Sequence, residues 1–245
     1  MTWKVEDLDR LVEFLRTKGV VYGPEGEDRI SFGELTEGTR PNVSRRSDVS
    51  ARQVLQPSTH YYMRFSDGPD PETRFEDYDT SPRVLFGVRP CDVRGLTMHD
   101  KVFAESESYR ALRGATAVVG LLCSRREPTC FCESMGGDPL SREGMDLVVY
   151  EVESGYIVAA ESERGRALME GASFPQAEGV IEPAVEETGH PAIDTAGLSE
   201  AMGRIDEEST AWEDVAFPCV GCRVCTYVCP TCHCFTVTDE VFGRS

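Results

Sequence analysis

The chain has 245 residues, of which 40% are hydrophobic and 28% charged, a composition typical of a globular protein with a sizeable core. Its formal net charge of −18 argues against nucleic acid as a partner, because phosphates would be repelled; the acidity either maintains solubility or forms a surface for a basic partner. The longest apolar run, 115–123, is far shorter than the roughly 20 residues that span a bilayer. With no secretory signal at the N-terminus, a cytoplasmic protein is expected.

The N-terminal part of the chain predicts short alternating elements. Apolar residues at helical spacing predict an amphipathic helix over 5–18. Short runs of β-branched and aromatic residues predict strands at 20–22 and 30–32. The polar stretch 37–58 is expected to be extended, and the proline- and acid-rich stretch 67–82 to be a surface loop.

Two apolar runs predict buried strands that each lead into a cysteine. The run 84–88 precedes Cys91, and the run 115–122 precedes Cys123. Open α/β sheets present their sites at the carboxyl ends of such strands. The two cysteines are therefore expected at one edge of a sheet.

Helices and a hairpin are expected around these strands. Proline at position 90 ends the first strand, and Asp92 is expected to cap a helix over about 93–104. The remaining elements are helices at 107–113, 162–171, 194–204 and 209–216, a hairpin of 147–150 with 156–159, and a loop over 172–192. Together they predict an α+β fold with a mixed sheet over residues 1–207, and the cysteine-rich segment 208–245 is expected to be a separate module.

The ten cysteines are crowded into two groups. Residues 1–90 and 133–218 contain none, six lie within 16 residues near the C-terminus, and four lie within 42 residues in the middle. A disulfide scaffold spreads its cysteines through a short secreted chain. The crowding therefore favours metal ligation over disulfides.

The C-terminal cysteines carry the strongest motif. Cys219, Cys222, Cys225 and Cys229-Pro form the spacing C-x2-C-x2-C-x3-C-P, which bacterial-type ferredoxins use to bind [4Fe–4S] clusters. Zinc sites also use C-x2-C pairs, but the two pairs are usually separated by a dozen or more residues. The run therefore predicts an iron–sulfur cluster and a partial ferredoxin-like segment.

The fourth ligand of that cluster is left open by the spacing. In two-cluster ferredoxins the fourth cysteine of such a run ligates the other cluster. No second run is present; Cys232 and Cys234 follow instead, and six cysteines cannot complete two four-thiolate clusters. We therefore expect Cys219, Cys222 and Cys225 to be ligands, while Cys229, Cys232 and Cys234 are further candidates.

The middle group consists of Cys91, Cys123, Cys130 and Cys132. Four thiolates that converge from two strand ends suit either a [4Fe–4S] cluster or a structural zinc ion, and the spacing matches no standard ferredoxin run. Arg89, close to Cys91, would favour the thiolate form and raise the potential of a cluster there.

Residues typical of catalysis are not evident. The sequence has no dinucleotide-binding or Walker A glycine motif and no Ser-His-Asp or Cys-His set, and its four histidines show no paired spacing. His233, between two cysteines, is the one histidine that is a candidate ligand. No active site is expected, and the sequence indicates an electron carrier.

Four blocks of sequence, with a supporting tripeptide, resemble a known family. They are Phe86-Gly-Val-Arg-Pro-Cys91-Asp92, Asp100-Lys-Val-Phe103, Thr129-Cys130-Phe131-Cys132-Glu-Ser-Met135-Gly136 and Cys229-Pro-Thr-Cys232-His-Cys234-Phe235, with Tyr22-Gly23-Pro24 near the N-terminus. In this order they are similar to the iron–sulfur beta subunit of cytoplasmic nickel–iron (sulf)hydrogenases, and to the corresponding iron–sulfur subunit of anaerobic sulfite reductases.

The resemblance implies a function and a set of ligands. It implies a subunit without an active site that relays electrons between two others, one flavin- and NAD(P)-linked and one catalytic. It implies one [4Fe–4S] cluster on Cys91, Cys123, Cys130 and Cys132, and a second held by Cys219, Cys222 and Cys225. The alternative from another class is a zinc-stabilised scaffold subunit without a redox role.

The chain departs from the family at its end. Family members continue for about a hundred residues and contain a second C-x2-C-x2-C-x3-C-P run. We therefore expect a fragment or a short form, in which the C-terminal cluster is partial or borrows a ligand.

Overall fold

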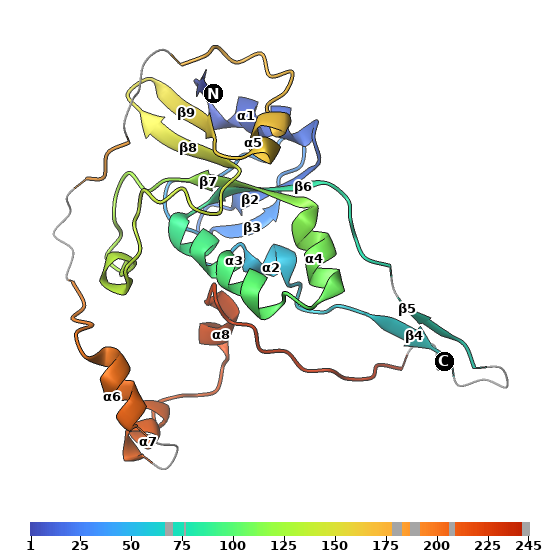
Figure 1. Ribbon diagram of the computed structural model, residues 1–245, viewed down its shortest axis with the longest axis vertical. Helices are drawn as coiled ribbons and strands as arrows, with labels where there is room; N and C mark the ends of the chain where they lie inside the picture. The colour runs from blue at the N-terminus through green and yellow to red at the C-terminus, as the bar shows by residue number, and fades with distance from the viewer. Residues whose placement is uncertain (67–70, 76, 178–182, 187–191, 206–208, 242–245) are drawn as a thin grey trace.

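The computed structural model describes residues 1–66, 71–75, 77–177, 183–186, 192–205 and 209–241 (Figure 1). The fold is α+β, built on a seven-stranded mixed sheet with the order β1-β9-β8-β7-β6-β2-β3. The strands are β1 (Thr2–Val5), β2 (Val20–Glu25), β3 (Ser31–Glu34), β6 (Arg83–Val88), β7 (Thr116–Leu121), β8 (Leu147–Val152) and β9 (Gly155–Ala160). A separate two-stranded ribbon pairs β4 (Met63–Phe65) with β5 (Thr73–Phe75).

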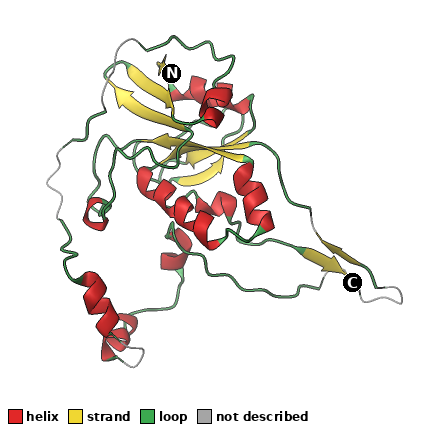
Figure 2. Cartoon of the chain, in the orientation of Figure 1, coloured by secondary structure: helices red, strands yellow, loops and turns green. Residues whose placement is uncertain are grey.

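Several helices connect and cover the strands, and others lie in the C-terminal part of the chain, as Figure 2 shows. They are α1 (Leu8–Arg16), α2 (Arg52–Leu55), α3 (Pro90–Val102), α4 (Glu107–Gly114), α5 (Glu163–Leu168), α6 (Leu198–Arg204), α7 (Thr210–Ala216) and α8 (Val224–Val228), with a short 3-10 helix at Glu133–Met135. Within the described residues, no helix is both long and apolar enough to cross a membrane.

The centre of the sheet is parallel and its margins are antiparallel. Strands β2, β6, β7 and β8 run in the same direction, while β9 pairs antiparallel with β8 and β1, and β3 pairs antiparallel with β2. All six residues of β7 are buried, as expected for a strand covered on both faces. The carboxyl ends of β6 and β7 therefore lie side by side at one edge.

Two hydrophobic cores lie on opposite faces of the sheet. On one face, Leu11 and Leu15 of α1 pack with Phe86 and Val119. On the other face, residues of α3 and α4 such as Leu96 pack with the alternate residues of the same strands. Among the described residues, neither core contains a cysteine. Within the described residues, the two cores therefore pack without any of the cysteines.

A β-bulge at Gly87 changes the direction of the chain just before Cys91. The register of β6 against β7 shifts between Phe86 and Val88. Gly87 has a φ of +74°, which a glycine adopts without a steric penalty. Val88 therefore faces the same core as Leu85, and the following turn delivers Cys91 to the first turn of α3.

Most of the predicted elements are confirmed. The expected amphipathic helix is α1, the two buried strands are β6 and β7, and the hairpin is β8 with β9. Four differences stand out. Strand β1 was not predicted, α2 lies within the stretch expected to be extended, β5 lies within the expected loop, and β4 lies just before it.

The predicted cap of α3 is wrong. Arg89 occupies the N-cap position, and Pro90 is the first helical residue, where its missing N–H costs nothing. Asp92 lies buried in the first turn, where its carboxyl is hydrogen-bonded to Ser50. Burial raises the pKa of Asp92 to about 6, although Ser50 and the nearby guanidinium groups of Arg46 and Arg89 oppose this effect.

The C-terminal part of the chain leaves the sheet and returns to it. Helices α6 and α7 stand away from the sheet, and the chain then comes back to place α8 below α3 (Figure 1). The proposed boundary between residues 207 and 208 lies outside the described residues.

Candidate metal centre

The middle group of cysteines lies at the edge formed by the carboxyl ends of β6 and β7. Cys91 is the second residue of α3, which follows β6, and Cys123 comes two residues after β7 ends. Arg89 ties the two turns together, because its guanidinium donates to the carbonyls of Leu122 and Val43 at 3.1 Å each. The predicted placement of Cys91 and Cys123 at strand ends is confirmed.

The loop after Cys123 carries the other two thiols of the middle group. Cys130 closes a turn, because its N–H donates to the carbonyl of Glu127 at 2.9 Å and its Sγ accepts from the N–H of Glu127 at 3.3 Å. The carbonyl of Cys132 accepts from the N–H of Gly137 at 2.8 Å. From α3, Arg94 donates to the carbonyl of Met135 at 2.9 Å.

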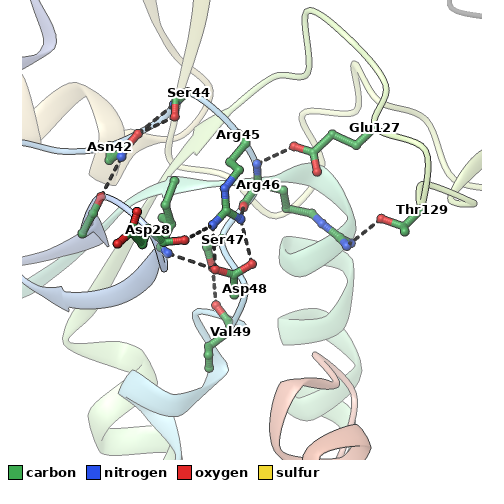
Figure 3. A network of polar contacts seen from close by, with 12 residues as sticks. Asp28, Asn42, Ser44, Arg45, Arg46, Ser47, Asp48, Val49, Glu127 and Thr129 are labelled. Carbon is green, nitrogen blue, oxygen red and sulfur yellow. Dashed lines mark hydrogen bonds and ion pairs between the residues drawn. The ribbon is translucent and has the colours of Figure 1, made fainter.

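A second segment, residues 42–49, lies over this loop (Figure 3). The N–H of Arg46 donates to Glu127 Oε1 at 2.6 Å, and the Arg46 guanidinium reaches Thr129 Oγ1 at 3.3 Å. Arg45 and Asp48 form an ion pair at 2.7 Å that shapes the segment itself. Sequence reasoning missed Arg46, because no local pattern links residues that are 81 positions apart.

The middle thiols influence one another electrostatically. Burial raises the pKa of Cys91 to about 12, and the charges of Asp92 and Cys123 add to this effect, while Arg46 opposes it. Burial is also the main cause of the raised pKa of Cys123 and of Cys132, and in each case neighbouring thiols of the group contribute. A cation bound beside Cys91, Cys123 and Cys132 would compensate the charge of their thiolates and oppose this rise in pKa.

Four thiols form a donor set that suits either a [4Fe–4S] cluster or a zinc ion. Among the residues that the structure describes, no three His, Cys, Asp or Glu side chains are close enough together to hold one metal ion. A zinc ion needs its sulfur ligands about 2.3 Å from one centre. A cubane is larger than an ion, so its four thiolates stand further apart. The four thiols are half-buried, and their charges influence one another.

The C-terminal group lies on and around α8. Cys219, Cys222, Cys225 and Cys234 are exposed, whereas Cys229 and Cys232 are half-buried; all ten cysteines of the chain are free. Gly221 and Arg223 adopt positive φ values of 67° and 61°, which wind the chain tightly between the first cysteines of the run. Within the described part of the chain, these cysteines, too, are not brought within reach of a common ion.

Cys229 is half-buried like the middle thiols but differs from Cys91, Cys123 and Cys132 in the direction of its pKa shift. Burial is the largest single influence on it and raises its pKa. Hydrogen bonds from Thr231 and the backbone of Cys232, with the charge of Arg52, together outweigh burial, so the pKa of the Cys229 thiol is lowered. The Sγ of Cys229 lies 3.2 Å from Thr231 Oγ1. A thiol with a lowered pKa ligates metal more readily at neutral pH.

Helix α8 is held against α2, and Pro230, just after α8, contacts α3. Arg52 donates to the carbonyls of Thr226 and Tyr227 at 3.4 and 3.1 Å, and the hydroxyl of Tyr227 donates to Gln53 at 3.0 Å. His99 Nε2 lies 3.0 Å from the carbonyl oxygen of Pro230. The ferredoxin-like run therefore contacts the helix that carries Cys91.

Comparison with known proteins gives one informative similarity. The chain is 30% identical over 172 residues to the protein named sulfhydrogenase 2 subunit beta of Pyrococcus furiosus, an alignment that covers 64% of this chain and 49% of the relative. The chain thus spans about half the length of the curated relative that it matches. No family model matches the chain. No solved structure matches it either.

Proposed function

We propose that the chain is an iron–sulfur electron-transfer subunit of a multisubunit oxidoreductase. The observation that carries the proposal is the gathering of four half-buried thiols at one edge of the sheet, close enough for their charges to influence one another. The similarity to a protein named as a sulfhydrogenase beta subunit supports the same conclusion independently.

The proposed ligands fall into two sets. Cys91, Cys123, Cys130 and Cys132 would hold one [4Fe–4S] cluster; Cys219, Cys222 and Cys225 would hold part of a second, with Cys229 as the candidate for its fourth ligand and Cys232 and Cys234 as further candidates. Such clusters supply reversible one-electron transfer. The role of the protein residues is to bind, to exclude water and to set the charge around each thiol.

The partners follow from the absence of a recognised catalytic set in the sequence. An electron carrier needs a donor and an acceptor. We propose a flavin- and NAD(P)-linked subunit on one side and a catalytic subunit of hydrogenase or sulfite-reductase type on the other. The name of the similar protein, a subunit of a sulfhydrogenase, supports an assembly of this kind.

Metal analysis of the full chain, purified without oxygen, tests the proposal. We expect iron and acid-labile sulfide with broad visible absorption, and the variant Cys130→Ala should lose about four irons. The variant Cys234→Ser, which alters an exposed thiol outside the middle group, should keep the iron of the middle site. One zinc ion and no iron in the native chain would instead identify a structural scaffold.

A further inference from the structure

Helix α3 carries three residues on one face: Cys91, which belongs to the middle group, and two that lie toward the C-terminal group. Cys91 lies in its first turn, and Gly95 and His99 follow at intervals of four residues. Residues spaced in this way share a helix face. At 1.5 Å per residue, Gly95 lies about 6 Å and His99 about 12 Å from Cys91 along the axis. We call these residues the α3 stripe.

Pro230 of the ferredoxin-like run is seated on the α3 stripe. The carbonyl oxygen of Pro230 only accepts hydrogen bonds, so His99 Nε2, 3.0 Å away, is the donor. A Cβ at position 95 would lie 2.9 Å from both the Cβ and the carbonyl oxygen of Pro230. Only glycine permits so close an approach, and it brings the residue after Cys229 to within about one helical turn of Cys91.

Burial identifies which end of the C-terminal run faces the middle group. Cys229 and Cys232 are half-buried, whereas the other four cysteines of the segment are exposed. Arg52 and Gln53 of α2 hold the last turn of α8, which leads directly into Cys229. The loop from Cys229 to Cys232 is therefore the docked end.

The contacts of His99 and Arg52 with the C-terminal segment leave buried nitrogen atoms unpaired, which lowers stability. The side chain of His99 is almost fully buried, at 2% exposure, yet its Nδ1 has no hydrogen-bond partner within the described residues. Arg52 Nε is the other buried side-chain atom in this condition there. Apolar side chains would fill the space without unpaired atoms. The polar residues instead fix the positions of particular backbone carbonyls at residues 226, 227 and 230.

We propose that the α3 stripe is a positioning device that holds the Cys229–Cys232 loop beside Cys91, so that an electron passes between the two cysteine groups along this face of the helix. The inference rests on the proposed function. With clusters held by the two groups, the step would be a one-electron exchange in which one cluster gives up the electron that the other accepts, and no covalent bond would form or break. Gly95 and His99 act by fixing the separation.

Thiol cross-linking of the full chain, reduced and free of iron, tests the placement. A short bifunctional thiol reagent followed by mass spectrometry should link Cys91 to Cys229 or Cys232. The link should be lost in Gly95→Val and in His99→Leu, and return in His99→Gln, which keeps an N–H donor. The matched control is Gly203→Val on α6, where an added Cβ meets nothing within 4 Å.

The outcomes separate this inference from the proposed function, because the cross-link is measured without iron. Absence of the link in the native chain, or its survival in Gly95→Val, overturns the inference whatever metal the protein binds. In the reduced chain with iron loaded at both cysteine groups, we expect the electron paramagnetic resonance spectrum to show magnetic interaction between the two iron centres. This interaction should disappear in Gly95→Val and persist in Gly203→Val; its persistence in Gly95→Val would also overturn the inference.

Discussion

At the scale of single residues, charge around the middle thiols is set by arginines that come from distant parts of the chain. Arg46 opposes the rise in the pKa of Cys91, and Arg89 opposes it for Cys123. Both side chains are fixed by hydrogen bonds, Arg46 to Thr129 and Arg89 to two backbone carbonyls. Fixed cations beside thiolate ligands favour the more negative, reduced state of a cluster.

If the middle cysteines hold the proposed cluster, removal of the Arg46 charge should lower its reduction potential. We expect Arg46→Gln to shift it by on the order of 50 mV to more negative values, because the reduced state loses a nearby positive charge. Redox titration followed by electron paramagnetic resonance measures the shift. Arg110→Gln on α4, an exposed position, serves as the control. Equal potentials in Arg46→Gln and the native chain would contradict the assignment.

At the scale of elements, the bulge at the end of β6 determines where Cys91 lies. Gly87 has a positive φ, and an added Cβ would lie 3.0 Å from Pro24 Cδ. We expect Gly87→Ala to reduce the free energy of unfolding by about 1 kcal/mol or more, since alanine is strained in this conformation. Urea denaturation measures this change.

The matched control for Gly87→Ala is Gly114→Ala. Gly114 ends α4, and an added Cβ there meets nothing within 4 Å. Its replacement should leave stability unchanged or raise it by about 0.5 kcal/mol. If the two variants had the same stability, the bulge would not constrain the turn before Cys91.

Prediction from sequence succeeded where the signal is local. The helical spacing in α1 and the apolar runs of β6 and β7 reflect burial of these segments, and the structure confirms them. It failed where contacts join distant residues. The segment around Arg46 contacts Glu127, and His99 contacts Pro230 across 131 positions. No local sequence pattern in these segments predicts either contact.

Strand β1 shows a related failure. Its four residues are too few to display a clear alternation, and its identity depends on antiparallel pairing with β9, far away in sequence. Its pairing and the burial of Trp3 and Val5 fix it as a strand. The ligand assignments of both cysteine groups remain predictions, which the metal analysis above addresses.

At the scale of the whole molecule, the sheet and the cysteine loops are separate in their stabilisation. Both hydrophobic cores lie against the sheet and, among the described residues, contain no cysteine, while the loops that carry the thiols are held mainly by hydrogen bonds. Metal-binding energy at such loops is local folding energy. Loss of metal should therefore affect the loops and spare the sheet.

Iron removal by a chelator should increase hydrogen exchange in residues 124–137 and 217–225, which precede the loop that His99 and Arg52 hold. Exchange in β6 and β7 should remain slow, because their burial does not depend on metal. Mass spectrometry of the iron-loaded and iron-free full chain compares the two regions directly. Uniformly fast exchange throughout the iron-free chain would show that metal holds the whole fold together.

The two faces of the sheet also differ in which of them could contact an electron donor or acceptor. Cys91 and the docked run lie on the side of α3, whereas α1 and α5 cover the opposite face (Figure 1). Under the proposed function, the packed apolar layer beneath α1 separates both cysteine groups from that face and disfavours electron transfer through it. Donor and acceptor must then both sit on the α3 side or around the protruding cysteines, and cross-links mapped in the assembled complex should avoid α1.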